Sequence, residues 1–526
     1  MSARHAKRDG DCGQIPLDAT GRYADRDEYS IPATRRIAIQ AAARLEIVNE
    51  SGSAARRQSL ATGSQAWHTI RAVPASALPL TIPRAGPFDR FIDDPLNFLR
   101  QARTTHGDLF ALRESGSIFS RADDGTGVVA AFGIDHQRTV LTDLDSFGMP
   151  VSAAHRLNLP PNLVILNRGL HSLTGSQHTT HKRSLATLLS ADHEQDAIAR
   201  VVDDVADRWT VGSTVHMLDE MRELALSISR RLLFGTRADE LTGLAERLRT
   251  YFQLRREASS PANPAGTVTV DELTRLGNAV DAELRNYVRE CRTRRTRDGI
   301  LGRLAGAEST PGMVLSEDEV IGHANVLFVS STEPIAVTLT WVFLILSQLP
   351  DLRRALREER TFGDLPLLDR VVHETLRILP PNAFMVRTTT RSVVLGDIEL
   401  PAHCEVVMCP FVSHRDPEYF PRPDHFVPDR WMGNPPSPFV YFPFGGGGHS
   451  CVGRTLALTV MRVAVSSLLA RYDLVLAGDQ EMDWRLHIIF MPRTDPLFAI
   501  QSTANVGARE RGQLRGPVAS LLKLDI

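Results

Sequence analysis

The chain has 526 residues, which exceeds the usual size of one domain and predicts more than one folding unit. Its composition is that of a water-soluble globular protein, with 43% hydrophobic and 23% charged residues. The formal net charge of −2 gives no electrostatic basis for binding nucleic acid or an anionic membrane surface.

The five cysteines are few, odd in number and without zinc-like pairing, which favours thiols in a reducing compartment over a disulfide framework. The first 21 residues contain no apolar run of seven or more residues, so the sequence predicts neither a signal peptide nor a membrane anchor there. A cytoplasmic protein is therefore expected.

Residues 1–78 are predicted to be a polar, flexible N-terminal extension in which residues 33–48 could form one amphipathic helix. The pattern of a packed domain begins at residue 79 and is expected to continue to residue 502. Residues 93–113 are predicted to form a capped helix followed by a strand, and residues 126–134 a second strand.

The middle of the chain, residues 174–350, is predicted to be helical, with one break rich in Pro, Ser and Gly at residues 256–270. A further helix is expected over residues 365–379, short strands over 391–400 and 404–412, and long loops beyond them. Residues 503–526 are expected to be a C-terminal tail. The fold class is therefore mainly α with a small β domain.

The stretch Val326–Leu346, "VLFVSSTEPIAVTLTWVFLIL", is long enough to cross a bilayer. Glu333 and Pro334 near its middle argue against a membrane span, because the charge alone would cost about 3 kcal/mol at the bilayer centre. Pro334 has no N–H, so the carbonyl of Ser330 loses its helical partner and the helix is expected to break. The hydroxyls of Ser331 and Thr332, with that of Ser330, could satisfy the freed backbone groups.

The segment "YFPFGGGGHSCVGRTLALTVMRVAVSSLLARY" places Cys451 after a run of four glycines and before a helical pattern. A cysteine at the entry to a helix is expected to favour the thiolate, because the helix dipole and free N–H groups stabilise negative charge. A buried inert cysteine is one alternative. A phosphate loop is another, but it would end in Lys-Ser/Thr, which is missing. A single thiolate in a backbone cradle suits the axial position of a haem iron.

The pattern Phe444-x-x-Gly447-x-x-x-Cys451-x-Gly453 resembles the haem-binding signature of the cytochrome P-450 family of haem-thiolate monooxygenases. The resemblance covers residues 79–502. It implies the cytochrome P-450 fold, a haem b cofactor, and Cys451 as the metal ligand. It also implies that Phe444, Gly445, Gly447 and Gly453 belong to the cofactor-binding loop.

Glu374 and Arg377 lie three residues apart in a predicted helix, on the face opposite its apolar residues. Taken alone, the spacing predicts an exposed ion pair worth a few tenths of a kcal/mol. In the family that the chain resembles, this pair is buried under the haem loop and joined by an arginine that follows a proline. Arg430, in "FVPDRW", matches that arginine, so the resemblance implies a structural network of these three residues.

Four further residues match the family's haem propionate contacts. They are Arg387, His449 two residues before the cysteine, and His178 and Lys182, which lie four residues apart on one helix face. Lys182 is one of only three lysines, at a position where the family usually has arginine.

The family's distal helix carries an (Ala/Gly)-Gly-x-(Asp/Glu)-Thr pattern, which corresponds here to residues 330–334, "SSTEP". Glu333 retains the acid, whereas Pro334 replaces the threonine that delivers protons to iron-bound oxygen. The relay would then run through Thr332, through water or through the substrate. Glu333, Thr332 and Pro334 are therefore the catalytic candidates.

The resemblance implies an oxygenase of specialised metabolism that acts on a small or medium hydrophobic substrate. Its electrons would come from a separate ferredoxin and ferredoxin reductase, and the protein would be a monomer. The pocket is expected along residues 150–175, 332–338, 382–385 and 488–491. Two alternatives stay open: a peroxide-driven peroxygenase or a catalyst of rearrangement or dehydration, because of Pro334, and a catalytically silent haem-binding sensor or partner module.

Overall fold

The computed structural model describes residues 78–120, 124–150, 157, 159–190, 194–258, 269–306, 308–310, 313–359, 366–486, 489–503 and 512–524. The predicted helix at 33–48, and the predicted N-terminal extension except for residue 78, lie outside these ranges. The proposed domain boundaries stay a prediction.

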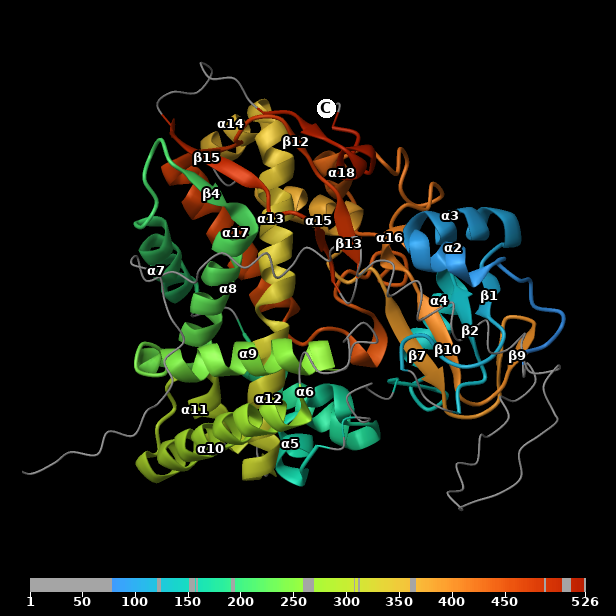
Figure 1. The fold of residues 1–526 in the computed structure, drawn as a ribbon, viewed down its shortest axis with the longest axis horizontal. Helices are drawn as coiled ribbons and strands as arrows, with labels where there is room; N and C mark the ends of the chain where they lie inside the picture. Colours follow the sequence, from blue (N-terminus) through green and yellow to red (C-terminus); the bar gives the residue numbers. More distant parts are fainter. Residues whose placement is uncertain are drawn as a thin grey trace, which may run out of the picture. The chain divides into compact units, whose positions relative to one another are not determined.

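Helices make up most of the described residues, and the β structure is small, which confirms the predicted fold class (Figure 1). The helices are α2 (Phe88–Asp93), α3 (Pro95–His106), α4 (Ile134–Thr142), α5 (Pro161–Leu166), α6 (Gly175–Leu188), α7 (Gln195–Ala206), α8 (Met217–Phe234), α9 (Thr242–Ala258), α10 (Val270–Arg294), α11 (Gly299–Gly306), α12 (Glu317–Ser330), α13 (Glu333–Gln348), α14 (Pro350–Glu358), α15 (Leu367–Ile378), α16 (Pro410–Ser413), α17 (Arg454–Arg471) and α18 (Pro517–Ser520).

The largest sheet has the strand order β1-β2-β10-β7-β3, in which β10 pairs parallel with β2 and the other pairs are antiparallel. A second sheet has the order β11-β15-β4, and the remaining strands pair in twos. The strands are β1 (Leu109–Arg113), β2 (Gly127–Ala131), β3 (Phe147–Gly148), β4 (Thr214–His216), β5 (Glu308–Thr310), β6 (Met313–Val314), β7 (Met385–Thr389), β8 (Val393–Leu395), β9 (Ile398–Leu400), β10 (Cys404–Met408), β11 (Tyr472–Leu476), β12 (Gln480–Glu481), β13 (Trp484–Leu486), β14 (Phe490–Pro492), β15 (Leu497–Ser502) and β16 (Leu514–Arg515).

Local sequence explains where α3 begins and ends. The carboxylate of Asp94 accepts a hydrogen bond from the backbone N–H of Asn97, and Pro95 occupies the first turn, where its missing N–H costs nothing. Gly107 follows the helix with φ of 82°, a conformation that favours glycine. The predicted capped helix and the strand after it are thus confirmed.

Helix α13 is the centre of the helical core. Every residue from Ile335 to Ser347 is buried, and the helix packs against α8, α17 and β11 (Figure 1). A helix that is apolar on all sides needs this surrounding, because no face of it can be left in water. By length and composition the segment Glu317–Gln348 could cross a membrane, but 67% of its most apolar window is buried inside the protein, as in a core helix.

The expected helix break is present. Helix α12 ends at Ser330 and α13 begins at Glu333, with Pro334 as the second residue of α13. The Ser331 hydroxyl donates a hydrogen bond to the Phe328 carbonyl at 3.0 Å. The Thr332 hydroxyl donates to the Val329 carbonyl at 3.3 Å. The side chains at the break therefore satisfy two carbonyls at the end of α12.

Residues 512–524, expected to be a tail, pack against the preceding chain. Strand β16 pairs parallel with β12, and the side chains of Val518, Leu521 and Leu522 are buried in the main core. The polar composition of residues 503–512 gave no indication of this return.

Candidate active site

The glycine-rich loop holds Cys451 by backbone hydrogen bonds just before α17. The Cys451 N–H donates to the Phe444 carbonyl at 2.7 Å, and the Gly445 N–H donates to the Phe442 carbonyl at 3.0 Å. The Gly453 N–H donates to the thiol sulfur. Cys451 is accessible, whereas Cys291, Cys404 and Cys409 are buried. Among the described cysteines, Cys451 alone could therefore bind a ligand without rearrangement.

Glycine is required where this loop passes α4. Gly447 has φ of +63°, and a Cβ there would lie 1.8 Å from the Leu141 carbonyl oxygen. A Cβ at Gly448 would lie 2.3 Å from the side chain of Leu144. The loop can lie this close to α4 only because these side chains are missing.

Burial raises the pKa of the Cys451 thiol, and this effect exceeds the opposing effects of the Gly453 N–H and the nearby charges of Lys182 and Arg454. This direction is opposite to the expected thiolate, which stays a prediction for the iron-bound protein. A coordinated metal ion deprotonates a thiol outright, so the iron would supply the missing stabilisation.

Two of the predicted propionate contacts meet across the loop. The His178 ring on α6 lies 4.1 Å from the His449 ring, centroid to centroid. Lys182, one turn along α6, donates from Nζ to the Gly448 carbonyl at 2.6 Å and to the Ser450 hydroxyl at 2.9 Å. Lys182 thus ties α6 to the cysteine loop, a contact that its spacing from His178 did not indicate.

Arg387 on β7 is buried, and its Nε has no hydrogen-bond partner within the described structure. Burial lowers its pKa to about 10. Burial and then the charge of Arg387 lower the pKa of His171, a residue that the sequence did not single out. Burial lowers the pKa of His449 to about 4, with smaller effects from His178 and Arg387. Arg387 and His178 are buried and His449 is half-buried, whereas His171 is exposed.

No carboxylate in the described part of the chain forms an ion pair with Arg387, Lys182, His171, His178 or His449. Arg387 and Lys182 carry positive charge without a carboxylate partner in the described structure, and the imidazoles can donate hydrogen bonds, so the cluster fits a ligand that brings its own negative charge. Haem has two propionates and an iron that a thiolate can bind. The accessible Cys451 thiol, the glycine loop and the unpaired Arg387 Nε therefore fit haem.

Beside the loop, Glu374 and Arg377 on α15 are fully buried, so the interpretation of an exposed pair is wrong. Arg377 donates to both oxygens of the carboxylate at 2.9 and 2.8 Å, and Arg430 donates to Oε1 at 2.9 Å. The Val427 N–H at 2.8 Å and the Trp431 indole N–H at 2.9 Å also donate to the Glu374 carboxylate, which therefore accepts five hydrogen bonds. These contacts hold the pKa of Glu374 below its usual value although burial opposes them.

His414 connects this network to the cysteine loop. Its Nε2 accepts the backbone N–H of Phe442 at 3.0 Å, and its Nδ1 lies 3.3 Å from the Arg377 carbonyl oxygen. These partners fix the neutral tautomer with the proton on Nδ1. Full burial lowers the pKa of His414 to about 3. A rigid connection thus runs from α15 to the residues that precede the glycines.

On the distal side, Glu333 forms an ion pair with Arg222 of α8. Arg222 Nη2 lies 2.6 Å from Glu333 Oε1, and its Nε lies 3.2 Å from Oε2. The same guanidinium lies 3.9 Å from the sulfur of Met491 on β14, within the stretch expected to line the pocket. Arg222 was not predicted, because nothing in the sequence distinguishes it from the many other arginines.

The break therefore brings together Thr332, Glu333 and Pro334, with Ser330 accessible just before them. The pocket-lining stretches are described only in part, since Ile488 and most of residues 151–158 lie outside the described residues.

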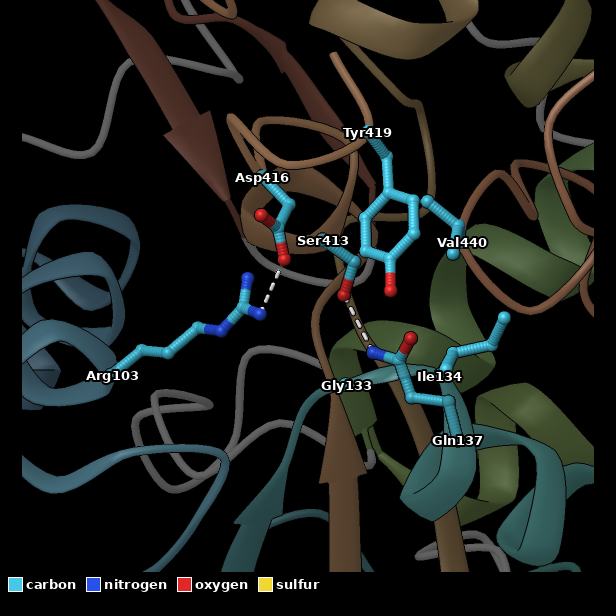
Figure 2. A pocket seen from close by; sticks show the side chains of 8 residues that line it. All are labelled: Arg103, Gly133, Ile134, Gln137, Ser413, Asp416, Tyr419 and Val440. Atoms are coloured by element: carbon cyan, nitrogen blue, oxygen red, sulfur yellow. Dashed lines mark hydrogen bonds and ion pairs between the residues drawn. The ribbon is translucent and has the colours of Figure 1, made fainter.

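A small pocket elsewhere is a separate feature. It lies among Gly133, Ile134, Tyr419, Val440 and two bonded pairs (Figure 2). Arg103 pairs with Asp416 at 2.5 Å, and Gln137 donates to the Ser413 hydroxyl at 2.6 Å. Its volume of about 10 Å³ suits one water molecule. Its polar groups are already paired, so it is not a substrate site.

Comparison with known proteins agrees with this geometry. Cyclooctat-9-en-7-ol 5-monooxygenase from Streptomyces melanosporofaciens is 28% identical over 59% of this chain and 73% of its own. Pentalenene oxygenase from Streptomyces avermitilis is 25% identical over 78% of this chain and 93% of its own.

Two solved structures share the fold. The retinoic acid bound cyanobacterial CYP120A1 has a TM-score of 0.62 at 21% identity, covering 82% of this chain and all of its own. The haem domain of cytochrome P450DA has a TM-score of 0.64 at 22% identity, covering 82% of this chain and 98% of its own. The family model described as Cytochrome P450 matches residues 97–495. On this match, the chain belongs to the cytochrome P450 family.

Proposed function

We propose that this haem-thiolate monooxygenase inserts oxygen into a small or medium apolar substrate, with electrons from a separate ferredoxin and its reductase. We further propose that it works as a cytoplasmic monomer. The observation that carries the proposal is the accessible thiol of Cys451 beside buried basic groups that have no carboxylate partner in the described structure. That arrangement fits an iron bound at the sulfur and two propionates bound at the basic side chains.

In this proposal Cys451 is the iron ligand, and Arg387, His178 and His449 receive the propionates. Lys182 fixes the loop through Gly448 and Ser450 and adds positive charge. The Glu374 network keeps the loop rigid from the other side. When bound, thiolate-ligated haem supplies the activation of oxygen.

The substrate class rests on two relatives. Their names denote an unsaturated ring alcohol and an unsaturated ring hydrocarbon. The described stretches expected to line the pocket supply Phe384, Ile335 and Met491, which are apolar. We therefore infer an apolar, ring-containing substrate that makes few polar contacts.

Proton delivery has to work without the usual threonine. The Thr332 hydroxyl donates to the Val329 carbonyl and keeps its lone pairs for another donor. The Ser331 hydroxyl is shared with the Phe328 carbonyl and the Ser229 hydroxyl at 2.8 Å. Glu333 is held by Arg222, so it must leave that ion pair before it can carry a proton elsewhere. Ser330 and Thr332 are therefore the hydroxyls best placed to pass protons.

A peroxide-driven peroxygenase is the second candidate, and Pro334 favours it, because this reaction does not need a threonine to protonate oxygen. Hydrogen peroxide already carries the two protons that O2 has to acquire.

The test compares product formation from a panel of apolar ring compounds under two conditions. One contains O2, ferredoxin, ferredoxin reductase and NADPH, and the other contains hydrogen peroxide alone. Product that requires the reductase chain supports the proposal. Product formed equally well with peroxide alone supports the second candidate and overturns the electron-transfer part of the proposal.

A further inference from the structure

A chain of three ionisable side chains joins α6 to α12 and has no part in the haem and distal sites. His181 on α6 and His323 on α12 are both buried, and His181 Nδ1 lies 2.8 Å from His323 Nε2. His181 Nε2 lies 3.4 Å from Oε1 of Glu319, one turn before His323. The order is therefore Glu319, His181, His323.

The two ends of this chain face different surroundings. The Glu319 side chain is 43% exposed and its other oxygen accepts the N–H and hydroxyl of Ser316, so this end reaches solvent. His323 is 2% exposed, and its Nδ1 has no hydrogen-bond partner in the described structure. A buried polar nitrogen without a partner is uncommon in proteins and calls for a water molecule or another group beside it.

Helix geometry indicates where the inner end leads. Along α12, Glu319, His323 and Ser330 lie within about 40° of one another around the helix axis. Ser330 is accessible and stands at the break that the distal site uses. It lies seven residues beyond His323, a rise of about 10 Å, with the apolar side chains of Val326 and Leu327 between them on the helix. The conduit therefore requires two or three hydrogen-bonded waters to pass these side chains.

We propose that Glu319, His181 and His323 form a proton conduit that carries protons from solvent to the distal site by way of Ser330. The inference rests on the proposed oxygenase function, which consumes protons, and it provides a route that needs neither the missing threonine nor release of Glu333 from Arg222.

Each inward transfer conserves protons and charge. The pKa of Glu319 is lowered: burial raises it, but the hydrogen bonds from Ser316 outweigh this, so the carboxylate is the resting form. The transfer begins when Glu319 has taken up a proton from solvent, with the other two protons on His181 Nδ1 and His323 Nδ1. His323 Nδ1 gives its proton to the water on the Ser330 side, His181 Nδ1 passes its proton to His323 Nε2, and Glu319 passes its proton to His181 Nε2. One proton has left at the inner end, and Glu319 takes the next one from solvent after the two rings have changed tautomer.

Burial and the neighbouring His181 lower the pKa of His323 to about 4, so this ring is neutral at neutral pH. A neutral imidazole has one donor and one acceptor nitrogen, as the transfer requires.

The test uses the full chain with haem bound and three variants. His323→Gln keeps an amide oxygen that can accept the hydrogen bond from His181 Nδ1 but cannot pass a proton on, and His323→Phe removes both functions. Glu319→Gln keeps the capping of Ser316, since glutamine also serves in a capping box. Glu272→Gln, in the first turn of α10, is the matched surface control.

The ratio of O2-driven to peroxide-driven product is measured for each protein, because peroxide brings its own protons. The conduit requires this ratio to fall about 10- to 100-fold in His323→Gln, His323→Phe and Glu319→Gln, since a positioned acid–base group contributes about 10²–10⁴-fold. Glu272→Gln should match the wild type. An unchanged ratio in His323→Gln would overturn the conduit. If His323→Phe alone were impaired, the hydrogen-bonded pair of His181 and His323 would have only a structural role.

A second measurement does not depend on turnover. In protein labelled with ¹⁵N-histidine, His323 should be neutral at pH 7 and joined to His181 by an N–H···N hydrogen bond that disappears in His323→Phe. Failure to observe that bond would overturn the conduit. Wild-type product that forms with peroxide but not with O2 and the reductase chain would overturn the reductase-fed function and the conduit together. O2-driven product in the wild type with an unchanged ratio in the variants would overturn the conduit alone.

Discussion

At the scale of single residues, the two sides of the cysteine loop differ. On one side a buried carboxylate is paired with two guanidinium groups, and on the other side a buried guanidinium has no carboxylate partner in the described structure. Glu374 accepts five hydrogen bonds and is shared by Arg377 and Arg430. Arg387, in contrast, is buried with an Nε that has no partner in the described structure. The first arrangement gives rigidity, and the second fits the proposed binding of an anionic propionate.

Removing the Glu374 carboxylate should be severely destabilising. Glu374→Ala leaves two guanidinium groups without their counterion, and breaking a buried pair in this way costs about 3–5 kcal/mol. Urea unfolding at pH 7 measures the loss in free energy of unfolding. Asp135→Asn, which removes an exposed i,i+3 pair with Arg138, is the control and should cost less than about 1 kcal/mol. Equal effects in the two variants would contradict the buried network.

At the scale of elements, the packing of α12 depends on small residues facing the chain between α5 and α6. A Cβ at Gly322 would lie 1.7 Å from the Arg168 carbonyl oxygen, and one at Gly169 would lie 2.2 Å from Val326 Cγ2. The backbone of residues 166–170 therefore lies directly on the helix that carries His323 and leads to the distal break.

Gly322→Ala should consequently lower the free energy of unfolding by about 1–3 kcal/mol or more, because the helix and the loop must separate. Gly243→Ala is the matched control in α9, where the added methyl would touch only the side chain of Arg247, at 3.4 Å. Since alanine is the better helix former by about 1 kcal/mol, that control should be neutral or stabilising. A stable Gly322→Ala protein would show that α12 is not held against this loop.

The break between α12 and α13 is a second feature of the elements that can be tested. Pro334→Thr restores the hydroxyl that relatives use and an N–H that can continue the helix. The ratio of O2-driven to peroxide-driven product should rise, because a second proton donor becomes available. If neither Pro334→Thr nor Glu333→Gln changes this ratio or the leakage of peroxide, the distal break has no part in proton delivery.

At the scale of the whole molecule, several histidines are buried in the neutral form. Burial lowers the pKa of His414 to about 3 and that of His323 to about 4. In the unfolded chain these rings bind protons near pH 6.5, so the unfolded state gains protons first as the pH falls. The stability that they contribute is complete above pH 6.5 and is lost as the pH falls towards 4.

The free energy of unfolding should therefore decrease between pH 6.5 and 4.5, by about 1.4 kcal/mol per pH unit for each such histidine once the unfolded ring is protonated. Urea unfolding at half-unit steps of pH measures the slope. A stability that stays constant over this range would mean that these rings are accessible to protons in the folded protein.

The sequence predicted the helices, the small β portion, the broken helix and the cysteine loop, because each of these depends on local periodicity or on a spaced motif. It did not predict Arg222, His171 or the pair of His181 and His323. Their roles depend on which helices meet in space, and the spacing of residues along one helix does not contain that information. The burial of Glu374 was implied by the family resemblance, whereas the helical pattern alone indicated an exposed pair.

The proposed function depends above all on Cys451 binding the haem iron as a thiolate. The most direct test is the absorption spectrum of the reduced, carbon monoxide-bound protein, compared with that of Cys451→Ala. The wild type should show the red-shifted Soret band of thiolate ligation, and the variant should lack it. A normal thiolate band in Cys451→Ala would contradict the assignment of the site.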